Sequence, residues 1–172
     1  MAQSAELEAA IMARRVEIHA LRAEARRVEE SQAEGNSGLV TGITVPSGWL
    51  AALVHGLAFL IRKWELEEAE ERAAGNTSAT DPDDAELSER MRSLASTIRE
   101  VEPGNAYTVS PCDYEALFKG IVAALHIQEF ELQSMSKYVN PSVLRFVAIE
   151  QRDALARFYS VLDDLLDRLE ER

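Results

Sequence analysis

Residues 37–72, SGLVTGITVPSGWLAALVHGLAFLIRKWELEEAEER, decide the fold because they contain the longest uncharged run of the chain. No Asp, Glu, Lys or Arg occurs between Leu39 and Ile61. A membrane-spanning helix needs about 20 continuous apolar residues, whereas Pro46-Ser47-Gly48 interrupts this run and leaves only residues 49–61. The stretch therefore predicts an apolar arm followed by a core or interface helix whose second half is charged.

The starts and ends of the other helices are marked by capping residues, prolines and glycines. Asp81-Pro82, Ser110-Pro111 and Asn140-Pro141 each place a capping residue before a proline and predict helix starts. Glycine at 35, at 75 and after Pro103 predicts the ends. The expected helical segments lie near residues 4–34, 48–74, 82–102, 111–138 and 141–171.

These segments predict an all-α fold: a five-helix antiparallel bundle with a long N-terminal coiled-coil-like helix and a short extended arm or β-hairpin near residues 36–48. Only two residues separate the last two helices, which must therefore form an antiparallel hairpin. We expect a single domain made of an N-terminal amphipathic helix (1–34), an extended arm (35–48) and a helical bundle core (49–172).

Apolar spacing indicates which helix faces are buried. The first helix has a narrow heptad-like seam, and the last has a wide stripe that predicts the core. The second and fourth helices are apolar on more than one face. One domain of this size has difficulty covering all of these faces, so the pattern favours contact with other subunits. The predicted core stripe of the last helix is Leu144, Ala148, Leu155, Phe158, Leu162, Leu165 and Leu169.

Composition restricts the classes of partner and the compartment. The chain has 30 acidic and 18 basic residues and a net charge of −12, so a nucleic-acid backbone would be repelled on average. Its one cysteine, Cys112, forms no internal disulfide, and the N-terminal segment has no signal-peptide pattern. We expect a cytoplasmic protein, or a virion component if the chain is viral.

Few residues have a pattern typical of catalysis or metal binding. Cys112 is expected near a helix start, but the adjacent Asp113 opposes thiolate formation, so a small packed side chain is the simpler interpretation. His126 and Glu129, with Glu150 on the next helix, only partly match the ligand pattern of di-iron bundles. His126 is therefore interpreted as a half-buried packing residue. Standard nucleotide, zinc and redox motifs are absent, and the sequence predicts no enzyme, cofactor or metal site.

Three functions are compatible with this pattern. The first is a non-catalytic structural or assembly protein, an oligomerising helical subunit of a larger complex. In helix order the chain resembles the small all-α head-to-tail connector proteins of tailed viruses, which form rings and insert arms into neighbours. The second is an acidic helical adaptor, chaperone or regulator that binds a partner through its N-terminal helix. The third is a metal-binding four-helix-type protein. The candidate interface residues are Leu7, Ile11, Ile18, Leu21, Val28, Leu39, Val40, Ile43, Val45, Trp49, Phe59, Ile127 and Phe130.

Overall fold

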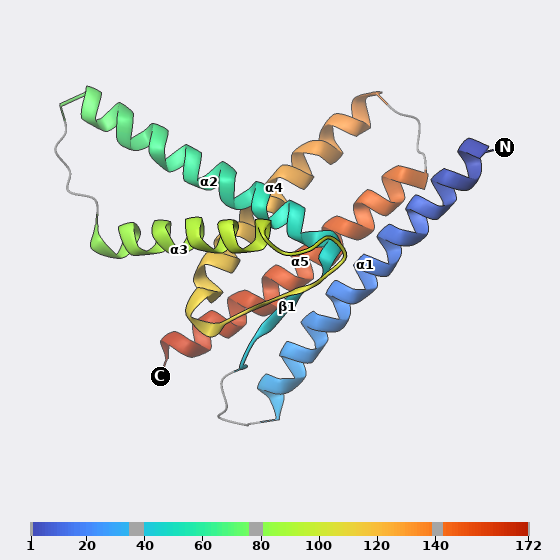
Figure 1. Cartoon of the computed structure of the whole chain (residues 1–172), viewed down its shortest axis with the longest axis horizontal. Helices are drawn as coiled ribbons and strands as arrows, with labels where there is room; N and C mark the ends of the chain where they lie inside the picture. Colours follow the sequence, from blue (N-terminus) through green and yellow to red (C-terminus); the bar gives the residue numbers. More distant parts are fainter. Residues whose placement is uncertain (1, 35–39, 76–80, 139–142, 172) are drawn as a thin grey trace.

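The computed structural model describes residues 2–34, 40–75, 81–138 and 143–171, and it confirms the all-α bundle within those ranges (Figure 1). Five α-helices account for most of the described chain, and two short strands form an antiparallel sheet. The elements are α1 (Ala2–Ala33), β1 (Ile43–Val45), α2 (Ser47–Ala73), α3 (Pro82–Arg99), β2 (Tyr107–Val109), the 3-10 turn η1 (Pro111–Asp113), α4 (Tyr114–Tyr138) and α5 (Val143–Glu170).

Two of the three predicted helix starts can be compared with the structure. Asp81 caps α3 as expected, because its side chain accepts a hydrogen bond of 3.0 Å from the backbone N–H of Asp83. Ser110 makes no such bond within the described residues, since its hydroxyl lies 3.1 Å from the Cys112 sulfur instead. The chain there forms a 3-10 turn, and α4 begins later than predicted. The start expected at Asn140-Pro141 lies outside the described residues.

α4 lies in the middle of the bundle, because it packs against α2, α3 and α5, whereas α1 packs mainly on α5. α4 and α5 run antiparallel, as the short connection predicted, whereas α1 runs parallel to α5 (Figure 1). Two ion pairs define this parallel register: Arg15 with Glu150 and Glu29 with Arg157. All five helices contribute to the core, and its fully buried members include Leu21, Leu57, Met91, Leu117 and Phe158.

Glycines allow α2 and α4 to approach closely where they cross. A Cβ atom at Gly56 would lie 2.5 Å from the carbonyl oxygen of Gly120 and 2.9 Å from the backbone nitrogen of Ala124. A side chain at this position would therefore separate the helices. The crossing places the N-terminal half of α2 against the middle of the bundle, while its charged second half extends away from the core (Figure 1).

The arm predicted near residues 36–48 is extended, and its described part forms strand β1. Its strand partner is distant in sequence: Ile43 pairs with Val109 and Val45 with Tyr107 in the antiparallel register. The side chains of Ile43 and Val45 are completely buried in the chain's own core. Within the described residues, the arm therefore packs against the core of its own chain.

The first turn of α5 differs from the predicted core stripe. Leu144 was expected in the core, but it is 36% exposed. The first buried side chain of α5 is Val147. The reason is geometric, since α5 enters the bundle only after its first turn. Further along the helix, Leu155, Phe158, Leu162 and Leu165 are buried as predicted.

Candidate functional site

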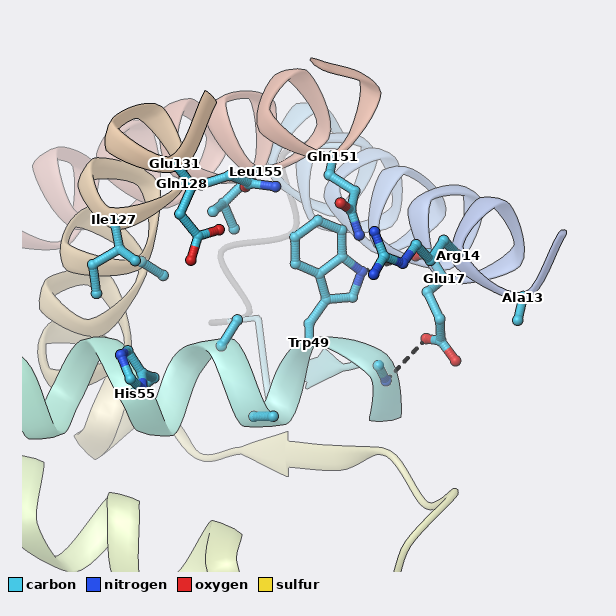
Figure 2. A pocket seen from close by; sticks show the side chains of 14 residues that line it. Ala13, Arg14, Glu17, Trp49, His55, Ile127, Gln128, Glu131, Gln151 and Leu155 are labelled. Atoms are coloured by element: carbon cyan, nitrogen blue, oxygen red, sulfur yellow. Dashed lines mark hydrogen bonds between the residues drawn. The ribbon is translucent and has the colours of Figure 1, made fainter. Parts of the chain in front are cut away.

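A pocket of about 590 Å³ opens where α1, α2, α4 and α5 meet (Figure 2). Its apolar floor comes from Trp49 and Leu155, both nearly fully buried, and from the small side chains of neighbouring alanines. Beside the buried Trp49, α2 lines the pocket with the exposed side chains of Ala51, Ala52 and His55. The lining residues are Ala13, Arg14, Glu17, Gly48, Trp49, Ala51, Ala52, His55, Ala124, Ile127, Gln128, Glu131, Gln151 and Leu155.

Glu17 fixes one end of the pocket by binding the first turn of α2. Its carboxylate accepts hydrogen bonds from the backbone N–H of Gly48 at 3.1 Å and from the Ser47 hydroxyl at 3.2 Å. The Trp49 indole N–H donates to the backbone carbonyl of Glu17 at 3.0 Å. The bond from the indole N–H holds the Trp49 ring in the pocket. The Glu17 carboxylate satisfies an N–H group at the start of α2.

The rim of the pocket carries polar side chains of both charges. Figure 2 shows Gln151 and Arg14 beside the Trp49 ring, while Gln128 and Glu131 project from α4 on the other side. His55 lies on α2 toward the far end. This lining combines an apolar floor with hydrogen-bonding groups, which suits the binding of an amphipathic side chain or small molecule.

A second polar group anchors the arm to α1 and α4. The Glu24 carboxylate accepts a bond of 2.8 Å from the Thr44 N–H, and Arg27 donates a bond of 2.6 Å to the Gly42 carbonyl. The Tyr114 hydroxyl donates to the backbone carbonyl of Val40. Burial raises the pKa of Tyr114 to about 12. The anchor satisfies one N–H group of β1 and two carbonyl groups of the residues before it, so its role is structural.

The candidate interface residues divide into buried and exposed groups. Only Leu7, Phe59 and Phe130 are largely exposed, Ile127 is half-buried in the pocket, and Leu39 lies outside the described residues. The others face the chain's own core, because α1 packs along α5 and the arm pairs with β2. These buried residues are Ile11, Ile18, Leu21, Val28, Val40, Ile43, Val45 and Trp49.

Exposed apolar side chains lie on the second half of α4 and the first turn of α5. Phe130 on α4, a candidate interface residue, is 71% exposed, and Phe146 on α5, which the sequence analysis missed, is 62% exposed. Val143 and Leu144 are exposed beside Phe146 in sequence. We call Phe130, Val143, Leu144 and Phe146 the tip patch. Its signal in the sequence was that Val143 and Phe146 lie off the main stripe of α5.

The residues considered for catalysis or metal binding lie on the surface. Cys112 is exposed rather than packed, because the 3-10 turn keeps it outside the core. His126 is also exposed rather than half-buried, and Glu150 pairs with Arg15. Across the described ranges, no group of three or more His, Cys, Asp or Glu side chains is arranged to hold a metal ion.

None of the helices, within their described residues, combines the length and apolar character needed to cross a membrane. The uncharged run from residue 39 to 61 is accordingly divided between the arm and the first half of α2. No protein-family model matches the chain, and no curated protein or solved structure shows significant similarity to it.

Proposed function

We propose that this chain is a non-catalytic structural subunit that assembles with further copies of itself. The observation that carries the proposal is its surface area. The accessible surface is 10950 Å², whereas a compact monomer of its mass, 19.1 kDa, is expected to expose about 8400 Å². The excess of about 2500 Å² exceeds the roughly 800 Å² that one partner contributes to a standard interface. An elongated chain with this much open surface suits a subunit with more than one contact.

The tip patch supplies apolar surface for one such contact. Single exposed apolar residues are common, but four on the second half of α4 and the first turn of α5 form a local concentration. Full burial of a phenylalanine side chain contributes about 1.5–3 kcal/mol, so covering Phe130 and Phe146 would add appreciably to association. The C-terminal end of α4 and the first turn of α5 lie at the outside of the bundle, where a neighbour can approach (Figure 1).

The position of the arm does not support the resemblance to ring-forming viral connectors. In such proteins the arm inserts into a neighbour, whereas here Ile43 and Val45 are buried in the same chain. The proposal is therefore self-assembly, without extension to a viral ring. The pocket beside Trp49 would be available to receive a side chain from a neighbouring subunit.

Light scattering coupled to size-exclusion chromatography tests the proposal across a dilution series. We expect a mass above 19.1 kDa for the wild-type chain that falls on dilution. The double variant Phe130→Asp/Phe146→Asp should assemble more weakly. Leu66→Asp is the matched control, because Leu66 is also more than half exposed but lies on the charged half of α2.

Two outcomes would contradict the proposal. A wild-type chain that remains a monomer at hundreds of micromolar would overturn self-assembly. The adaptor function would then explain the open surface better, and a different protein would have to cover it. If Leu66→Asp weakens assembly as much as the double variant does, the tip patch is not the contact.

A further inference from the structure

Helix α1 has two apolar stripes on opposite sides. The inner stripe, which includes Ile11, Ile18 and Leu21, is buried against the bundle. At 100° per residue, a second stripe lies about half a turn away, and all of its members are exposed. It contains no charged residue between Ala2 and Ala23. We call this stripe the outer seam; it consists of Ala2, Ala5, Ala9, Met12, Val16, His19 and Ala23.

The spacing of the outer seam is that of a coiled-coil contact. Its members follow one another at alternating steps of three and four residues, which keeps them on one side of a supercoiled helix. The solvent side of a surface helix normally carries charged residues, yet here Met12 and Val16 are 60% and 63% exposed. The seam therefore resembles a buried face that lacks its cover.

The N-terminal part of α1 provides independent support for a missing partner. Residues 2–10 are all exposed, and Ile11 is the first buried side chain of the helix. These residues continue a packed helix but have no packed side chain of their own, and most helical stability in proteins comes from packing of an apolar face. A second helix along the outer seam would cover this part of α1 together with Met12 and Val16.

We propose that the outer seam packs against the outer seam of a second copy of the chain, with the two α1 helices antiparallel. The alanines permit close approach, as small residues do at helix contacts. In this register Met12 meets Val16 of the second copy, and Ala5 meets Ala23 of the second copy. In this register the two seams would lie side by side from residue 5 to residue 23, over about 27 Å. This inference rests on the proposed self-assembly and identifies one contact of it.

Charge selects the antiparallel orientation. Glu8 and Arg22 flank the same side of the seam, and neither pairs with any residue that the structure describes. Antiparallel packing brings Glu8 of each copy to Arg22 of the other, which gives two attractive pairs. Arg15 lies near the two-fold axis, but it is already paired with Glu150 at 3.6 Å. Parallel packing would leave Glu8 without a basic partner and would bring Arg22 toward Arg27 of the other copy, although Arg27 is itself paired with Glu24.

Chemical cross-linking tests the orientation. In a Cys112→Ser background, one sample carries Ala5→Cys and the other Ala23→Cys, and the two are mixed and treated with a short bifunctional maleimide. Because Cys112 is the one native cysteine, each variant chain holds a single thiol, and no cross-link can form within a chain. We expect the mixed product of the two variants to predominate. Predominance of products that join two identical variants would overturn the antiparallel arrangement.

Charge reversal tests the pairing. Glu8→Arg or Arg22→Glu alone should weaken the dimer by about three- to tenfold, since each change creates two repulsive pairs between exposed side chains. The double variant Glu8→Arg/Arg22→Glu should return to within about twofold of wild type, because both pairs are restored with opposite polarity. Glu102→Arg, the same charge change on an exposed residue after α3, is the control.

These results separate the inference from the proposed function. If the wild-type chain assembles but neither cross-links in this pattern nor responds to the charge reversals, the outer-seam contact is wrong and self-assembly stands. A monomeric wild-type chain would overturn both. Val16→Glu adds a check, because this side chain is exposed and the change leaves the monomer folded while it places charge in the seam. An unchanged dissociation constant for Val16→Glu would also contradict the contact.

Discussion

The Glu17 carboxylate accepts a 3.1 Å hydrogen bond from the backbone N–H of Gly48, so the middle of α1 caps the start of α2. Pro46, which precedes α2, contributes no side-chain cap. The cap is tertiary, and it ties the first helix to the second at the edge of the pocket. A Cβ at Gly48 would lie 2.4 Å from the Glu17 side chain, which explains why a glycine suits this position.

Removing this cap is expected to lower the free energy of unfolding. Glu17→Ala should cost about 1 kcal/mol, as loss of other helix caps does, and Glu17→Gln should cost less because an acceptor remains. Urea unfolding at one protein concentration measures the difference. Glu30→Ala, on the same helix, is the control. Equal stability of Glu17→Ala and wild type would show that solvent satisfies the α2 start.

At the α2–α4 crossing, a change from glycine to alanine is expected to lower stability, although helix propensity alone would raise it. Alanine normally stabilises a helix relative to glycine by about 1 kcal/mol. At Gly56 the added Cβ would meet backbone atoms of α4, so Gly56→Ala should instead destabilise the fold by about 1–3 kcal/mol. Thermal unfolding followed by circular dichroism measures the change.

Gly120→Ala is the matched comparison for this crossing. Its Cβ would meet the side-chain ends of Leu53 and Leu57, which can move, rather than backbone. A smaller loss of stability is therefore expected for Gly120→Ala than for Gly56→Ala. The reverse order would mean that the helices separate more easily than the two leucines repack.

The arm should become locally unstable when Glu24 is removed. Glu24→Ala deprives the Thr44 N–H of its acceptor and Arg27 of its partner. Loss of a bond of about 1 kcal/mol predicts a rise of about fivefold in amide exchange at Thr44. Hydrogen exchange followed by NMR measures this, with the amide of Phe158 in the core as the reference. An equal rise at both amides would indicate global rather than local opening.

The buried hydroxyl of Tyr114 predicts a pH-dependent contribution to stability. Tyr114→Phe removes the donor to the Val40 carbonyl and should cost about 1–3 kcal/mol at pH 8. Burial raises the pKa of Tyr114 to about 12, above the value of about 10 for an unfolded tyrosine. Above pH 10 the unfolded chain binds fewer protons than the folded one, so the stability contributed by Tyr114 is lost as pH rises toward 12.

Unfolding in urea at pH 8 and pH 11 tests this dependence. The stability difference between wild type and Tyr114→Phe should shrink at pH 11, because phenylalanine does not ionise. The two proteins differ only at residue 114, so the comparison isolates this side chain. A difference that stays constant across this range would contradict the raised pKa.

Most of the helices could be predicted because their signals are local. The Asp81 cap acts within one turn of α3, and the apolar stripe of α5 follows the helix period. The pairing of Ile43 with Val109 could not be predicted, because two strands of three residues carry little information about a partner so far along the chain. The pocket was missed for the same reason: Glu17, Trp49 and Gln151 come from separate segments.

By itself, the sequence determined the number and order of helices, the division of the uncharged run at Pro46-Ser47-Gly48 and the apolar stripes on each helix. Only the tertiary structure decided which stripes are covered by the chain itself. Periodicity shows that a face is apolar, but its cover depends on contacts between distant segments. The inner stripe of α1 is covered by the chain's own helices, whereas Met12 and Val16 on its outer seam remain open to a partner.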